Sequence, residues 1–232
     1  MILKQLQDLI GEIYDVSIAH DVYDFLVTDR KRLPAAAPSH GSDEELIVAQ
    51  PTAENDGEVG MSLYLDPGLL ERLRQADPMQ RLHAGNVADC WTALEGVSHF
   101  LYVAWNAGHD KPVSLLELEM QAEVDKYVAS YWLLRRQFPG RFPDELLRVL
   151  FERTRIDPTL AQGREDLYRH ASRYAQRFCR KLEHSFRGAH RRSFRAFGGD
   201  DDGGGARNVL AELRRFYRLT NARKVAHIER TA

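Results

Sequence analysis

The chain has 232 residues, of which 44% are hydrophobic and 28% are charged. These fractions are ordinary for a globular protein and supply enough apolar side chains for a sizeable core. No window approaches the roughly 18 uncharged apolar residues of a membrane span, and the stretch MILKQLQDLIGEIYD lacks the cleavage site of a secretory signal. Cys90 and Cys179 stand in apolar contexts, which predicts buried free thiols. We therefore expect a cytoplasmic protein without a membrane partner.

Charge is divided unevenly along the chain. Residues 1–163 contain 15 Lys and Arg against 26 Asp and Glu, whereas residues 164–232 contain 17 against 8. The resulting net charges, −11 and +9, add up to the −2 of the whole chain. A separation of this size favours a polyanionic partner for the basic part, or docking of the two parts on each other.

The first third of the sequence predicts one helix and a small antiparallel sheet. Apolar residues recur at helical spacing over residues 3–14, whereas residues 18–28 fit either a strand or a short helix. Residues 45–50 and 58–65 are typical of the two strands of a hairpin. A short helix is expected after Asp66, with Pro67 in its first turn.

The centre of the chain predicts two long antiparallel helices. From Asn86, a suitable N-cap, apolar residues repeat every three and four positions up to Gly108, which would end the helix in a left-handed conformation. The second helix begins at the capping box Ser114-Leu-Leu-Glu117 and ends before a Pro-Gly pair. Two long helices with a short connection lie antiparallel, so residues 86–137 predict an αα-hairpin.

The last third predicts further helices. Residues 144–154 and 164–187 have helical periodicity, and so have residues 206–219, which precede a short terminal helix. The glycine-rich segment 196–206 predicts a flexible loop, because consecutive glycines cannot offset their ordering entropy.

The expected fold is mainly α (α+β). It consists of a central antiparallel αα-hairpin with further helices and a small antiparallel β-sheet near the N-terminus. We expect an acidic N-terminal segment with the β-hairpin over residues 1–82, and a helical domain with basic C-terminal helices over residues 83–232, packed as one unit.

A glutamate and a histidine share one flank of the first hairpin helix. Glu95 and His99 are four residues apart, so their side chains can touch. Counting back from the turn of the hairpin places Gln121 and Asp125 of the second helix opposite this pair. The four residues form a candidate polar site, whereas Glu119 is assigned to the other flank and explained by the helix dipole.

This group has two interpretations. Imidazole and carboxylate are suitable ligands for zinc, iron or manganese, which makes Glu95, His99 and Asp125 candidate ligands of a divalent metal in a metal-dependent enzyme. A histidine beside a carboxylate can also act as a general base. Neither the zincin spacing nor the Glu-x-x-His of di-metal bundles is present. The structural interpretation, in which the pair simply satisfies two half-buried groups, is the favoured one.

Arginines form a stripe along the predicted long helix and beyond it. Guanidinium groups bind phosphates bidentately, and arginine greatly outnumbers lysine here. Interleaved aromatic residues, among them Tyr174 and Phe178, either stack on bases or pack in the core. The candidate polyanion-binding residues are Arg169, Arg173, Arg177, Arg180, Arg187, Arg191 and Arg192.

The motifs of common nucleotide and cofactor enzymes are absent from the sequence, as are a Gly-x-Ser-x-Gly elbow and a helix-turn-helix. The preferred hypothesis is a binding or regulatory protein without a cofactor, which contacts nucleic acid or an acidic protein through the arginine stripe. The alternatives are the metal-dependent enzyme and an interaction module in which the acidic and basic parts dock to form homo-oligomers.

Overall fold

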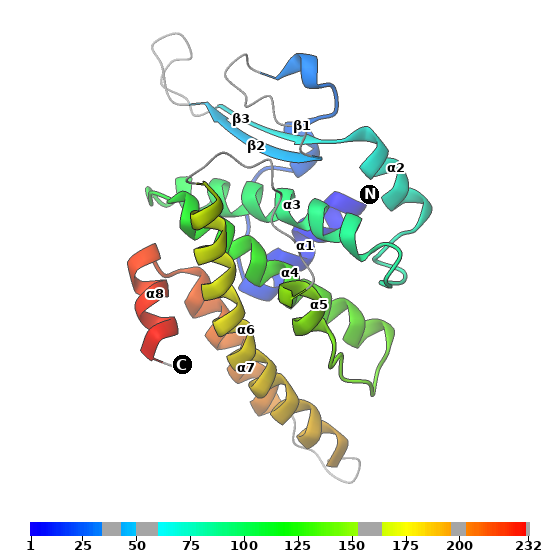
Figure 1. Ribbon diagram of the computed structural model, residues 1–232, viewed down its shortest axis with the longest axis vertical. Helices are drawn as coiled ribbons and strands as arrows, with labels where there is room; N and C mark the ends of the chain where they lie inside the picture. The colour runs from blue at the N-terminus through cyan, green and yellow to red at the C-terminus, as the bar shows by residue number, and fades with distance from the viewer. Residues whose placement is uncertain (34–42, 50–59, 153–163, 196–202, 231–232) are drawn as a thin grey trace.

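The computed structural model describes residues 1–33, 43–49, 60–152, 164–195 and 203–230 (Figure 1). Over these residues the fold is mainly helical with a small sheet from the N-terminal part of the chain, as predicted. In chain order, the elements are α1 (Ile2–Tyr14), η1 (Val22–Phe25), β1 (Leu26–Val27), η2 (Arg30–Arg32), β2 (Glu44–Ala49), β3 (Gly60–Leu65), α2 (Pro67–Gln75), α3 (Val87–Ala107), α4 (Leu115–Gln137), α5 (Leu146–Glu152), α6 (Arg164–Arg195), α7 (Gly203–Tyr217) and α8 (Asn221–Arg230).

The sheet has three strands in the order β1-β3-β2. The predicted hairpin is confirmed: β2 pairs antiparallel with β3, and Leu46 lies opposite Leu63. The sheet as a whole is mixed, because the short strand β1 joins β3 in parallel. The ambiguous segment 18–28 thus contains both a short helix and a strand. The sheet packs across α3, with β2 and β3 in contact with that helix (Figure 1).

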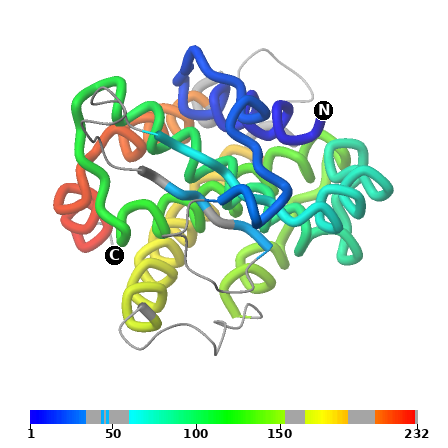
Figure 2. Tube along the Cα trace, turned by 90° about the horizontal axis from the view of Figure 1, so that it is seen from above, coloured from blue at the N-terminus to red at the C-terminus, as the bar shows by residue number. Residues whose placement is uncertain are grey.

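The hairpin of α3 and α4 forms the centre of the molecule, as predicted. α3 contacts α1 and the sheet, whereas α4 contacts α5 and lies along α6. α7 packs between α6 and α1, so a helix from the last third of the chain lies against the first helix. Seen from above, α1 and the N-terminal half of α6 lie on opposite sides of the molecule (Figure 2).

At both ends of α3, the residues that form the cap differ from the prediction. Asn86 makes no side-chain cap; its amide oxygen accepts from the backbone N–H of His83 at 2.9 Å and so holds the preceding turn. Gly108 has a right-handed conformation with φ −65°, and the left-handed residue is Asp110, with φ 52°. The turn after α3 therefore extends two residues beyond the predicted glycine cap. Asp110 can take the left-handed conformation there, because aspartate tolerates this region better than most residues.

Two C-terminal helices extend beyond their predicted bounds. α6 continues to Arg195, and α7 begins at Gly203, inside the segment 196–206 for which a flexible loop was predicted. Residues 196–202 lie outside the described residues. Val209, Leu213 and Phe216 of α7 are buried against the core. This tertiary packing outweighs the low helix propensity of the three glycines at its start.

Both cysteines are buried free thiols, as predicted. Burial raises the pKa of Cys90 to about 12 and that of Cys179 well above its ordinary value, which keeps both thiols protonated and unreactive. In the described part of the chain, no helix is both long enough and apolar enough to cross a membrane.

Candidate functional site

The α3–α4 hairpin buries many polar side chains, and burying a polar group is costly unless it is paired. These side chains and their partners fall into two groups. We name one the His99 cluster, with Glu44, Glu95, His99, Glu119, Glu123 and Lys126. We name the other the Lys224 network, with Tyr14, Ser98, Tyr102, Glu117, Gln121, Asp125 and Lys224.

In the His99 cluster the imidazole stands between two carboxylates. Nδ1 lies 3.5 Å from Oε1 of Glu44 on β2, and Nε2 lies 3.7 Å from Oε2 of Glu119 on α4. His99 is only 5% exposed, and its Nε2 has no hydrogen-bond partner among the described residues. One ring nitrogen therefore faces an orienting carboxylate, while the other is aimed at a second carboxylate without a bond to it.

Lys126 completes the cluster on its outer side. Its Nζ lies 2.6 Å from Glu95 and 2.8 Å from Glu123. The side chain of Glu95 is 27% exposed, against 6% for His99, so the cluster reaches the surface at Glu95. Glu95, His99 and Glu119 each place one ligand atom within 4.8 Å of the other two.

A glycine permits the close approach of the sheet to α3. A Cβ on Gly96 would lie 2.9 Å from Cγ of Glu44 and 2.9 Å from Cδ1 of Leu63. With a side chain at this position, Glu44 and Leu63 could not keep their present side-chain positions. Gly96 is therefore the position on α3 that allows Glu44 to reach His99.

The electrostatics of the cluster are dominated by its carboxylates. Burial alone would lower the pKa of His99, but the charges of Glu119, Glu44 and Glu95 outweigh burial and raise it to about 9. Burial raises the pKa of Glu119 to about 7 against the opposing charge of His99. The cluster thus holds four carboxyl groups and two cationic groups, and it retains a proton at neutral pH.

The Lys224 network lies on the same hairpin but is fully enclosed. Lys224 of α8 is 0% exposed, and its Nζ donates to the hydroxyl of Tyr102 at 2.8 Å and to Oε1 of Gln121 at 2.5 Å. Its ammonium also lies 4.4 Å and 5.0 Å from the ring centroids of Tyr102 and Phe216, which gives cation–π contacts.

Asp125 is the main acceptor of this network. It accepts hydrogen bonds from the Tyr14 hydroxyl at 2.5 Å, from the Ser98 hydroxyl at 2.6 Å and from Nε2 of Gln121 at 2.7 Å. The Tyr102 hydroxyl in turn donates to Glu117 at 2.5 Å. These four donors all have an acceptor, so the network satisfies itself.

Burial shifts both charged ends of this network toward neutrality. Burial lowers the pKa of Lys224 to about 7, despite the opposing charges of Glu117 and Asp125. Burial likewise raises the pKa of Asp125 to about 6, despite its three hydrogen bonds. Such a network rigidifies the contact between α1, the hairpin and α8.

The four residues of the predicted polar site are thus divided between two groups. Glu95 and His99 do share one cluster, but Gln121 and Asp125 bond within the Lys224 network. Glu119, which was assigned to the opposite flank, takes the place expected for Asp125. Both flanks of α4 meet α3, Glu119 at His99 and Asp125 at Ser98, and helical periodicity alone does not fix which flank faces which residue.

Sequence reasoning missed several members of both groups. Glu44 and Lys224 reach the hairpin from β2 and α8, which are distant in sequence, and no local pattern signals their approach. A signal did exist for Lys126, because it follows Glu123 by three residues on α4 and can pair with it there.

The arginines of the predicted stripe differ in whether they make an ion pair. Arg169 pairs with Glu165 at 2.5 Å, and Arg187 pairs with Glu183 at 3.1 Å and with Asp144. The side chains of Arg191 and Arg192 lie outside the description. The remaining candidates make no ion pair with any described residue: Arg173, Arg177 and Arg180.

Arg214 of α7 and Arg218, which directly follows this helix, have a structural role. Arg214 donates to the carbonyl of Ile13 at 3.3 Å, and Arg218 donates to the carbonyls of Tyr14 at 3.0 Å and Asp15 at 2.8 Å. These carbonyls end α1, where the helix leaves its acceptors unsatisfied and its dipole favours a cation. Part of the positive charge of the C-terminal region therefore caps the first helix of the same chain.

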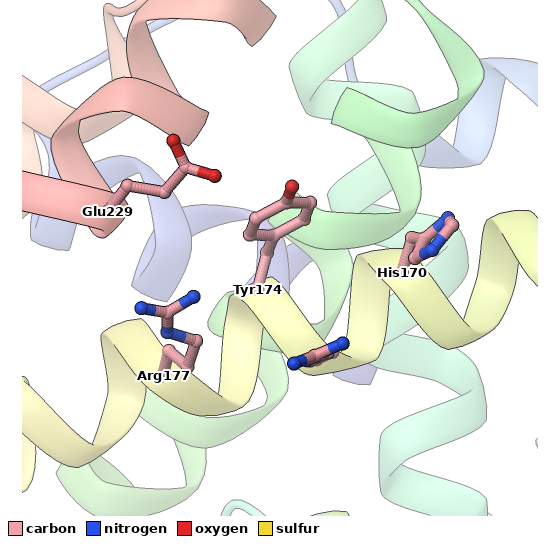
Figure 3. Close-up of a pocket in the computed structure, with 5 residues that line it drawn as sticks. His170, Tyr174, Arg177 and Glu229 are labelled. Carbon is pink, nitrogen blue, oxygen red and sulfur yellow. The ribbon is translucent and has the colours of Figure 1, made fainter. Parts of the chain in front are cut away.

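Two of the three unpaired arginines, Arg173 and Arg177, border a pocket on α6. It has a volume of about 210 Å³ and is lined by His170, Arg173, Tyr174, Arg177 and Glu229. His170, Tyr174 and Arg177 project from α6, and Glu229 faces them from α8 (Figure 3). The interleaved aromatics deeper on the helix, such as Phe178, are buried and belong to the core.

No protein-family model matches the chain, and no curated protein or solved structure does either.

Proposed function

We propose that the chain binds the phosphate groups of a single-stranded nucleic acid on the exposed face of α6. The observation that carries this proposal is the set of Arg173, Arg177 and Arg180, which make no ion pair with a carboxylate of the described part of the molecule. Arginine binds phosphate bidentately and is always charged.

The spacing of these arginines suits a phosphate backbone. At about 1.5 Å of rise per residue, they lie about 6 Å and about 4.5 Å apart along the helix axis, within roughly 60° of arc. Tyr174 is half-buried at the pocket and presents a ring on which a base can stack. A stacking ring beside unpaired guanidinium groups favours single strands over duplexes.

Glu229 opposes an anion at the same place, because its carboxylate lines the pocket with Arg173 and Arg177 (Figure 3). An anion that enters the pocket therefore has to compete with this carboxylate for the two arginines. Glu229→Gln is expected to tighten binding, whereas loss of the arginines weakens it.

The experiment is fluorescence anisotropy of a labelled single-stranded oligonucleotide over a salt series. The doubly substituted Arg173→Glu, Arg177→Glu chain is expected to bind at least about tenfold more weakly, with a shallower dependence on salt, because each phosphate contact releases counterions. Arg81→Glu is the matched control for the single variant Arg173→Glu, since Arg81 is exposed near α2 and the substitution makes the same change of charge away from α6.

Two competitors separate the partner classes. If polyglutamate of equal charge displaces the oligonucleotide, an acidic protein partner is favoured. If a duplex binds as tightly as a single strand, base stacking on Tyr174 does not contribute to binding. Equal binding by the wild type, the double variant and Arg81→Glu would contradict the proposal. Homo-oligomerisation through the acidic and basic parts stays a prediction, which size-exclusion chromatography at low and high salt tests.

A further inference from the structure

We propose that Nε2 of His99 and the carboxylates of Glu95 and Glu119 bind one divalent transition-metal ion, while Glu44 orients the imidazole through Nδ1. This site is separate from the face of α6 and independent of the proposed nucleic-acid binding. It differs from the metal site expected from the sequence, because Glu119 replaces Asp125.

The two ring nitrogens of His99 have the surroundings of a metal-ligating histidine. A histidine that ligates a metal through one nitrogen typically presents its other ring N–H to a carboxylate, which fixes the ring. Here Nδ1 faces Glu44 at 3.5 Å, and Nε2 is buried, has no hydrogen-bond partner in the described structure, and is aimed at Glu119. A buried polar atom without a partner requires an explanation, and a metal ion supplies one.

The balance of charge is the second argument. In this cluster the four carboxyl groups of Glu44, Glu95, Glu119 and Glu123 lie beside two cationic groups, His99 and Lys126, and Lys126 makes its ion pairs with Glu95 and Glu123. An ion with two positive charges would compensate these buried carboxylates more fully than one proton does. The proton on His99 would leave when the metal binds.

The ligand set indicates the class of ion. One imidazole nitrogen with carboxylate oxygens suits zinc, manganese or ferrous iron, and it suits calcium poorly. Bonds of about 2.1 Å would bring the ligand atoms to roughly 3.4 Å from one another, about 1.4 Å closer than the 4.8 Å limit within which they now lie. Rotation of the glutamate side chains is enough for this, and Glu95 provides the entrance from solvent.

The test uses the full chain, treated with EDTA, dialysed, and titrated calorimetrically with Zn²⁺ and separately with Mn²⁺. We expect one ion per chain for at least one metal, with a heat that depends on the ionisation enthalpy of the buffer, because binding releases a proton. His99→Gln and Glu119→Gln should weaken binding about 100-fold or more. Asp125→Asn is the matched control, a buried carboxylate of the same hairpin outside the site, and should bind as the wild type does.

Lys126→Met separates a metal site from an ordinary ion-pair network. This change removes a positive charge beside Glu95 and should strengthen metal binding about tenfold, the reverse of the ligand variants. If His99→Gln does not fold, as judged by circular dichroism, Glu119→Gln and Lys126→Met decide the question. A wild-type chain that binds neither ion with a Kd below about 0.1 mM, or a Glu119→Gln chain that binds as tightly as the wild type, overturns the proposal.

Discussion

The two polar groups on the α3–α4 hairpin are built from similar residues and differ in how completely they satisfy one another. In the Lys224 network the hydroxyls of Tyr14, Ser98 and Tyr102 all donate to carboxylates at 2.5 to 2.6 Å. In the His99 cluster the imidazole lies 3.5 Å and 3.7 Å from its carboxylates, and its Nε2 makes no bond to a described residue.

This difference separates structure from function within one hairpin. A closed network of short hydrogen bonds stabilises a single arrangement of helices and has no capacity left for a ligand. A cluster with surplus carboxylates, an unbonded nitrogen and one half-exposed edge has that capacity. Burial alone does not distinguish the two groups, because both contain charged side chains that are less than a tenth exposed.

The largest expected effect comes from opening the closed network. Asp125→Ala removes the acceptor of Tyr14, Ser98 and Gln121 and leaves three buried donors without a partner. We expect the free energy of unfolding to fall by about 4 kcal/mol, measured by urea denaturation at pH 7. Glu119→Gln in the His99 cluster should cost about 1 kcal/mol or less. Equal losses from the two variants would contradict the distinction between the networks.

The next effect is a dependence of stability on pH that is specific to Lys224. Its folded-state pKa of about 7 lies below the ordinary 10.5, so the unfolded chain binds this proton more tightly. The stability that Lys224 contributes is therefore present at high pH and lost as pH falls toward 7. Between pH 9.5 and pH 7 we expect a loss of about 3 kcal/mol that Lys224→Met does not show. Urea denaturation of both chains at several pH values measures this, and parallel curves would refute it.

The smallest effect concerns the approach of the sheet to α3. In Gly96→Ala the new Cβ meets Cγ of Glu44 and Cδ1 of Leu63 at 2.9 Å, so these side chains, or the strands that carry them, have to shift. We expect a loss of about 2 kcal/mol in thermal or urea denaturation, together with weaker Zn²⁺ binding, because Glu44 moves away from His99. Gly108→Ala is the control: its Cβ would lie 3.6 Å from its nearest neighbours, an ordinary contact, and stability should change by less than about 0.5 kcal/mol. A Gly96→Ala chain as stable as this control would show that the sheet tolerates the side chain.

Local sequence patterns predicted the helices and the β-hairpin well, and the reason is physical. Apolar residues at three- and four-residue spacing between Asn86 and Gly108 allow a buried helical face. The alternation around Leu63 predicts a strand, although Tyr64 on the other face of β3 is buried as well. The ends of these elements were less predictable. Asn86 and Gly108 both match a cap by residue type, yet neighbouring turns, including the left-handed Asp110, determined which residue ends the helix.

The candidate site was predicted only as far as a single helix determines it. Glu95 and His99 lie four residues apart on α3, so helix geometry alone places them together. Glu44, Glu119 and Lys224 reach the hairpin from other elements, and only packing fixes which of the two groups each one joins. The same holds for the arginines: sequence shows their abundance, whereas folding assigns Arg218 to the end of α1 and leaves Arg173 unpaired.

The sequence by itself determined the helical hairpin, the two paired strands, the buried thiols and the excess of positive charge near the C-terminus, because each follows from residues close together in the chain. Only the tertiary structure decided which buried polar groups are satisfied and which arginines are neutralised. Those outcomes depend on how α4 packs against α3 and on the contacts that β2 and α8 make with the hairpin. Side-chain contacts between elements that are distant in sequence produce no periodic pattern in it.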